Sequence, residues 1–178
     1  MIIRTERLEL VPLTADALSL SLAGDRAGVE RLLGVTLPVE WPIYPDLFTM
    51  RLAKLKEDPA LLPWLTRAMV LRETAEVIGV TGFHSAPGAE YLIQFSPGAV
   101  EFGYTVLPAW RRRGFARETA LGLMNWATTE HGIRKFIMSI RPDNQPSQAI
   151  AQQLGFVRIG SHQDELDGEE DVLEMRVC

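Results

Sequence analysis

The sequence has little cysteine and little histidine. Its 178 residues include one cysteine, Cys178, and three histidines. One cysteine cannot form a disulfide within the chain, and a Cys/His cluster of the structural zinc type needs about four such ligands. These shortages argue against a disulfide-stabilised secreted protein and against a metal site. They fit a protein of the reducing cytoplasm.

Long hydrophobic runs and excess positive charge are also missing. No apolar run approaches the roughly 20 residues that cross a bilayer. Residues 1–10 show no apolar region followed by small residues, so we expect neither a secretory signal nor a membrane partner. The net charge of −5 argues against nucleic-acid binding, which needs a basic surface to neutralise phosphates. A cationic or neutral amine is compatible with this charge.

What is present is an ordinary globular composition, with 47% hydrophobic and 23% charged residues. We expect residues 1–178 to form a single domain with a hydrophobic core of its own. The charges are uneven: residues 111–117 are basic, and residues 164–174 are acidic. The acidic segment is either a solvated hairpin or a surface that attracts a cationic substrate.

Apolar periodicity predicts alternating strands and helices. Strands are expected at residues 7–13, 67–73, 76–84, 100–107, 135–140, 156–160 and 171–178, and an extra short strand at residues 90–95. Helices are expected at residues 16–22, 25–33, 47–56, 114–131 and 145–154, with the proline-broken residues 37–45 irregular. This order predicts a mixed α/β layer with one strand–helix–strand crossover between residues 100 and 140.

The segment after the strand at residues 100–107 carries chemistry. Arg111-x-x-Gly114-x-Ala116 precedes the longest helix, whose first N–H groups lack partners within the helix and attract anions. Gly114 and Ala116 leave the backbone accessible, and the arginines strengthen attraction to a pyrophosphate. The pattern is neither a Walker A loop nor Gly-x-Gly-x-x-Gly. Alternatively, the arginines form only an exposed turn and Gly114 only caps the helix.

A second pattern follows the next strand. Asn144 and Ser147 open a helix that closes with the Leu-Gly-Phe of residues 154–156. Taken alone, Asn144 is an N-cap and Ser147 a residue of the first turn.

Together these stretches resemble the GNAT superfamily of acetyl-CoA-dependent N-acetyltransferases. Residues 111–116 match its Gln/Arg-x-x-Gly-x-Gly/Ala pyrophosphate loop, with Ala116 for the last glycine, and residues 144–156 match its Asn-x-x-Ser/Ala…Leu-Gly-Phe segment. TERLELVPLTADAL at residues 5–18 and EFGYTVLP at residues 101–108 are similar to the ribosomal-protein N-terminal acetyltransferase (Rim-type) branch. The resemblance implies an α/β (α+β) fold, in which helices flank a mixed, mostly antiparallel central sheet that splays between two parallel strands.

The resemblance also implies a coenzyme site between the strands at residues 100–107 and 135–140. The backbone of Tyr104, Thr105 and Val106 would pair with the pantetheine arm, and the Val106 N–H would polarise the acyl carbonyl. Asn144 would hold the pantetheine, with Ser147 beside it. The pyrophosphate would be bound by Arg111, Arg112, Arg113, Gly114, Phe115, Ala116 and Arg117.

In such a mechanism the amine attacks directly, without a covalent intermediate, and Cys178 at the C-terminus is a poor nucleophile. Glu101 is either the base that deprotonates the ammonium or a carboxylate paired with an arginine. His84 either serves through a water or is an ordinary surface histidine. Ala151 stands where many members have the tyrosine that protonates the thiolate, so Ser147 or water would take that role.

The acceptor would be a primary amine, either a protein N-terminus or a small molecule. Trp41, Tyr44, Phe48 and Trp64 either line its pocket or fill the core, and Asp46 or the acidic segment would attract a cationic amine. Two other functions stay open: a non-catalytic acyl-CoA sensor of the same fold, and a nucleotide-phosphate binder. The protein is expected to be a monomer or a homodimer.

Overall fold

The computed structural model describes residues 1–164 and 168–177 and divides the chain into two compact units. The first unit comprises Met1–Gly82 and Tyr104–Gly122, and the second comprises Phe83–Gly103 and Leu123–Cys178. The division falls inside three elements, which are β4 (Val77–Phe83), β5 (Val100–Val106) and α5 (Phe115–His131). The prediction of one domain over residues 1–178 stays a prediction.

Antiparallel strands form the sheet of the first unit. β1 (Ile3–Arg4), β2 (Leu8–Pro12), β3 (Thr66–Leu71) and β4 pair in this order, each antiparallel to the next. The end of β5 belongs to the same unit, where the Leu107 N–H donates to the Ile78 carbonyl at 2.9 Å. β3 and the β4 residues of this unit are buried throughout, as strands covered on both faces are.

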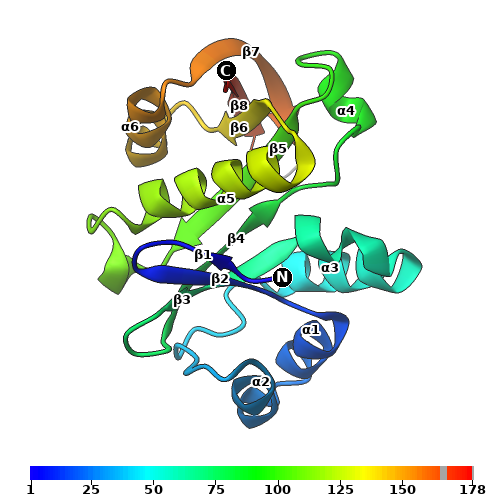
Figure 1. Cartoon of the computed structure of the whole chain (residues 1–178), viewed down its shortest axis with the longest axis vertical. Coiled ribbons are helices and arrows are strands. Elements are labelled where there is room, and N and C mark those ends of the chain that lie inside the picture. The colour runs from blue at the N-terminus through cyan, green and yellow to red at the C-terminus, as the bar shows by residue number, and fades with distance from the viewer. Residues whose placement is uncertain (165–167, 178) are drawn as a thin grey trace. The chain divides into compact units, whose positions relative to one another are not determined.

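Helices of the first unit complete its core. They are α1 (Ala15–Leu22), α2 (Arg26–Leu33), α3 (Pro45–Glu57) and the 3₁₀ turns η1 (Pro59–Trp64) and η2 (Pro108–Trp110). The side chains of Thr14 and Asp25 cap α1 and α2 by accepting N–H bonds from their first turns. Helix α1 contacts both α2 and α3 (Figure 1). Leu18, Phe48 and Val80 are among the side chains that these helices and strands bury together.

The second unit holds the parallel strand pair. β5 pairs in parallel with β6 (Lys135–Ile140) through two residue pairs, Val100 with Phe136 and Glu101 with Ile137. β6 pairs antiparallel with β8 (Gly168–Arg176), and β8 with β7 (Val157–Asp164). The helices here are α4 (Glu90–Ile93), α6 (Gln145–Leu154) and the later turns of α5. Phe102 packs edge-on against Phe83, Phe136 and Phe156 with ring centroids 6.1–6.5 Å apart.

These pairings confirm the predicted fold class. The structure is a mixed α/β fold with helices beside the strands, β5–β6 is parallel, and the other strand pairs given above are antiparallel. The predicted crossover is the connection β5–α5–β6. No helix among the described residues has the length and apolar character needed to cross a membrane.

One predicted strand is wrong. Residues 90–93 form the single helical turn α4, and residues 94–95 a turn after it, so none of them is in a strand. A short apolar run fits either structure, and here the turn buries Leu92 against Ile137 and Val172 while Ile93 stays exposed. The sequence also missed the two-residue strand β1 and placed the starts of β7 and β8 within a few residues.

Candidate functional site

The loop before α5 is exposed and has an unusual backbone. Residues 111–114 are exposed, and both Arg112 (φ 60°) and Gly114 (φ 83°) are left-handed. Within the part of the chain that the structure describes, the backbone N–H groups of residues 112–117 have no hydrogen-bond acceptor. The loop therefore presents consecutive N–H donors at the positive end of a 17-residue helix, the arrangement that binds phosphate groups.

The arginines of this loop differ in how free their side chains are to contact a bound anion. Nε of Arg111 donates to the Val106 carbonyl at 2.9 Å, so this side chain secures the end of β5. The guanidinium of Arg113 lies over the Trp110 ring, 4.9 Å from its centroid. Arg112 and Arg117 are exposed, so these two are the arginines best able to follow a bound anion.

The backbone N–H groups at the end of β5 point in defined directions. The Leu107 N–H points to β4, where it bonds the Ile78 carbonyl. Because successive N–H groups of a strand point to opposite edges, the Val106 N–H points to the other edge. Tyr104 and Thr105 are half-buried, and the hydroxyl of Tyr44 lies 3.3 Å from Oγ1 of Thr105. The predicted groups Tyr104, Thr105 and Val106 are thus in one unit with the loop.

Glu101 is a buried, charged carboxylate in the second unit. Its side chain is 4% exposed, and its Oε2 lies 3.4 Å from Nδ1 of His84. Burial alone would raise the pKa of Glu101. Hydrogen bonding and charge from His84, with hydrogen bonds from Ser139 and Tyr91, lower this pKa to about 2. The sequence named Glu101 and His84 separately, and the structure brings them together.

His84 has room beside β5 because residue 103 is a glycine. A Cβ at Gly103 would lie 3.1 Å from Nε2 of the imidazole. The His84 side chain is 44% exposed, whereas its carboxylate partner is buried. The pair thus presents one nitrogen to the carboxylate and leaves much of the ring accessible, an arrangement suited to proton transfer.

The residues that open α6 have structural roles. Oδ1 of Asn144 accepts from the Ser147 N–H at 3.3 Å, which confirms the N-cap interpretation. Asn144 is exposed, and Ser147 is half-buried. Ala151, at the position of the missing tyrosine, is fully buried and has no hydroxyl of its own.

Of the four aromatic residues considered for an acceptor pocket or for the core, the structure places some in the core. Trp41, Phe48 and Trp64 are buried, and the rings of Trp41 and Phe48 pack edge to face 5.2 Å apart, so these three belong to the core. Tyr44 is 45% exposed and reaches Thr105, which leaves it as the candidate acceptor-side residue of this group. Asp46 is also exposed.

An open pocket of about 350 Å³, which the sequence did not predict, lies in the first unit between residues 36–40 and 107–110. Its lining includes two carboxylates, Glu40 and Glu76, beside Pro108 and Trp110. Such a lining suits a cation with an apolar body. No sequence signal marked it, because its walls come from segments about 70 residues apart.

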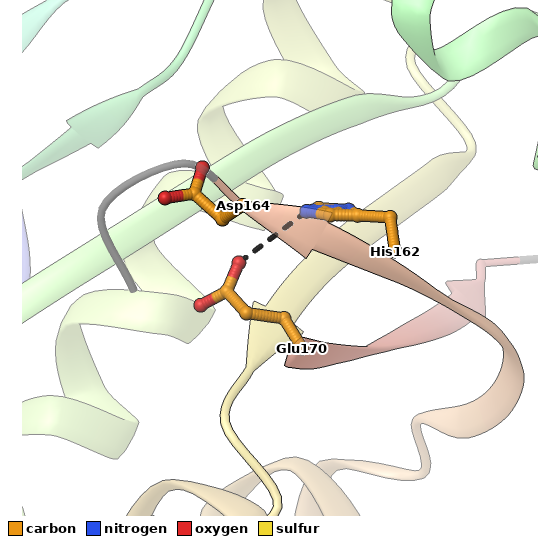
Figure 2. Close-up of side chains that lie close together, drawn as sticks. All are labelled: His162, Asp164 and Glu170. Atoms are coloured by element: carbon orange, nitrogen blue, oxygen red, sulfur yellow. Dashed lines mark ion pairs between the residues drawn. The ribbon is translucent and has the colours of Figure 1, made fainter. Parts of the chain in front are cut away.

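The acidic segment forms the β7–β8 hairpin, as far as the structure describes it; residues 165–167 and Cys178 lie outside the described residues. His162, Asp164 and Glu170 gather on this hairpin, as Figure 2 shows, with potential ligand atoms within 4.8 Å of one another. His162 lies opposite Glu170 in register, and Nε2 is 3.4 Å from Oε2. Such residues suit a divalent cation, but a cross-strand pair also stabilises a hairpin without one.

The sequence is similar to those of known proteins. The family description "Acetyltransferase (GNAT) domain" matches residues 7–157. "Uncharacterized N-acetyltransferase YjdG" of Bacillus subtilis (strain 168) is 25% identical over 162 residues, covering 88% of this chain and 90% of that protein.

Solved structures agree on the fold. A putative GnaT-family acetyltransferase from Bordetella pertussis superposes with a TM-score of 0.68 at 20% identity, over 99% of both chains. RimL, a ribosomal L7/L12 alpha-N-protein acetyltransferase solved with coenzyme A, gives a TM-score of 0.63 at 17% identity, over 99% of this chain and 98% of that one. At these identities the structures show the fold, which agrees with the predicted Rim-type resemblance. The family match over most of the sequence confirms the predicted family: the chain belongs to the GNAT acetyltransferases.

Proposed function

We propose that the protein transfers the acetyl group of acetyl-CoA to a primary amine. The observation that carries the proposal is that, among the residues the structure describes, the N–H groups of residues 112–117 have no hydrogen-bond acceptor, in the exposed loop before α5 and in its first turn. A diphosphate suits such donors, and the GNAT family uses acetyl-CoA, whose linker is a pyrophosphate.

The first unit would bind the coenzyme. Residues 112–117 would donate N–H groups to the pyrophosphate, with Arg112 and Arg117 adding charge. Arg111 would act through the end of β5, since its Nε already bonds the Val106 carbonyl. The Val106 N–H, directed away from β4, would polarise the acetyl carbonyl. In the second unit, Asn144 would hold the pantetheine with its amide nitrogen, because its oxygen caps α6.

The reaction needs a free amine. A carboxylate with a pKa of about 2 is a poor proton acceptor, so Glu101 serves better by holding His84 than by acting as the base. We propose that His84 accepts the proton, directly or through a water. The amine nitrogen then bonds to the acetyl carbon, and the carbon–sulfur bond breaks. The second proton that the nitrogen loses passes through Ser147 or water to the thiolate, so coenzyme A leaves as the thiol and Ser147 keeps its own proton.

The acceptor is proposed only as a class, a protein N-terminus or a small-molecule amine. Tyr44 would contact it, because its hydroxyl reaches Thr105 beside the proposed acetyl position. A cytoplasmic location and a monomeric or homodimeric state stay predictions.

A thiol-release assay with acetyl-CoA tests the proposal against amino-terminal peptides and small amines. Release of coenzyme A that depends on the amine is expected, together with an acetylated product by mass spectrometry. Binding of acetyl-CoA without turnover for any amine would favour the acyl-CoA sensor. Equal binding of ATP and acetyl-CoA would favour a nucleotide-phosphate binder and refute the role of the pantetheine contacts.

A further inference from the structure

Arg7 joins the turn between β1 and β2 to the start of α5. Its backbone N–H donates to Oε1 of Glu118 and its Nε donates to Oε2, both at 2.7 Å. Its Nη1 donates to the Arg113 carbonyl at 3.0 Å, and its guanidinium lies 4.3 Å from the centroid of the Phe115 ring. All these residues belong to the first unit. A single side chain thus contacts the loop, the first residue of the helix and its first turn.

The bond to the Arg113 carbonyl sets the direction of an N–H group. In a planar trans peptide the carbonyl and the following N–H point in opposite directions. Because Arg7 holds the Arg113 carbonyl, the Gly114 N–H must point away from Arg7. The left-handed conformation of Arg112 is unfavourable in a free chain for a residue with a Cβ, so a contact that holds the loop, such as that of Arg7, favours it.

The bonds to Glu118 have an electrostatic consequence. Burial would raise the pKa of Glu118, but hydrogen bonds from Thr5 and Arg7 and the charge of Arg7 lower it, so the carboxylate is ionised. An unpaired carboxylate in the first turn of α5 would repel a phosphate bound there. Arg7 pairs with this charge and so reduces the repulsion.

The same face of α5 is fixed one turn later. A Cβ at Gly122 would lie 2.6 Å from Cγ2 of Thr5, so the helix approaches the β1–β2 turn as closely as only a glycine allows. Glu118 and Gly122 are four residues apart and share one helix face. The β1–β2 turn is therefore a fixed support for the helix start.

We infer that Arg7 is a positioning residue for the diphosphate of acetyl-CoA: it orients the loop N–H groups through the Arg113 carbonyl and neutralises Glu118. The inference rests on the proposed function, since it assumes that this loop binds the coenzyme. Arg7 lies in the segment TERL, residues 5–8, to which the proposed reaction assigns no other role.

The test measures acetyl-CoA binding by isothermal titration calorimetry and the steady-state constants of the parent and of Arg7→Met. Arg72→Met is the matched control, because Nη1 of Arg72 donates to the Thr5 and Glu6 carbonyls of the same turn. Among the described residues, the Arg72 side chain has no hydrogen bond to the loop or to Glu118. Arg7→Met should raise Kd and the KM for acetyl-CoA on the order of tenfold, with kcat and the KM for the amine little changed. Arg72→Met should leave Kd within about twofold.

Two further variants separate the two effects. Arg7→Lys keeps the charge but cannot donate to Glu118 and Arg113 in the geometry of a guanidinium, so Kd should still rise. Adding Glu118→Gln to Arg7→Met should recover part of the lost affinity by removing the unpaired carboxylate. Thermal unfolding checks that each variant is folded; if Arg7→Met is not, Arg7→Lys decides.

The outcomes are distinct. If the parent does not bind acetyl-CoA, the proposed function fails and the inference with it. If the parent binds and the Arg7 variants bind equally well, the inference is wrong while the proposed function stands. If Arg72→Met loses as much affinity for acetyl-CoA as Arg7→Met, Arg7 only stabilises the turn and does not position the loop. If the double variant recovers no affinity, Arg7 does not act by neutralising Glu118.

Discussion

Replacing Glu101 by glutamine should remove a pH-dependent part of the protein's stability. Glu101 has a pKa of about 2 in the folded protein, against an ordinary value of 4.5. At about 1.4 kcal/mol per pKa unit, the difference corresponds to about 3 kcal/mol of stability at neutral pH. The side chain is almost fully buried, so solvent screening takes little from this value.

The sign follows from proton binding. The folded pKa is depressed, so the stabilisation is fully present above the unfolded pKa of 4.5 and is lost as the pH falls toward about 2. By about pH 3 the parent should have lost about 2 kcal/mol from this group, and Glu101→Gln should lose none of it. Glutamine has nearly the same shape as glutamate and does not ionise, so any packing cost of the substitution is the same at every pH.

Urea unfolding of both proteins between about pH 6 and pH 3 measures this difference. The gap in free energy of unfolding between parent and variant should shrink by about 2 kcal/mol across that range. The other carboxylates titrate equally in both proteins and cancel. A gap that stays constant with pH would refute the reasoning that the contacts of Glu101 hold it ionised.

Three other predictions concern the loop, the core and a helix cap. Gly114→Glu should raise the Kd for acetyl-CoA at least on the order of tenfold by calorimetry, since it adds bulk and negative charge where φ is +83°; unchanged binding would contradict the placement of the loop. Trp41→Ala should lower the free energy of unfolding by about 3–5 kcal/mol in urea, since its ring is buried and its Nε1 bonds Ser21. Tyr44→Ala, at an exposed position, should cost under about 1 kcal/mol, and equal losses would argue against the core assignment. Asn144→Ala should cost about 1 kcal/mol in the same assay by removing the α6 cap, and no loss would show that the cap contributes nothing.

Many helices and strands could be predicted from residues that are close together in the sequence. The predicted limits of β6 and α6 coincide with the structure, and α5 begins one residue later than predicted, because apolar periodicity and caps act within a few residues. The error at residues 90–95 has the opposite cause. Six residues carry too little periodicity to separate a strand from a helical turn, and contacts of Leu92 with β6 and β8 decided it.

Part of the candidate site could also be predicted from adjacent residues, and part could not. The loop at residues 111–117 could be identified because glycine, arginines and a helix start are adjacent in the sequence. The pairing of His84 with Glu101 could not, since the spacing of two residues on different strands depends on their register. The sequence likewise left a pocket role and a core role open for four aromatic residues, of which the structure buries three.

By itself, the sequence determined the order of the elements and an anion-binding helix start, since both depend on side chains and backbone groups a few positions apart. Only the tertiary structure decided which groups hold that start in place. Arg7 and Glu118 lie 111 residues apart and meet because the β1–β2 turn lies against the first turns of α5. Contacts of this range leave no periodic trace in a sequence, because folding and not spacing brings them within hydrogen-bonding distance.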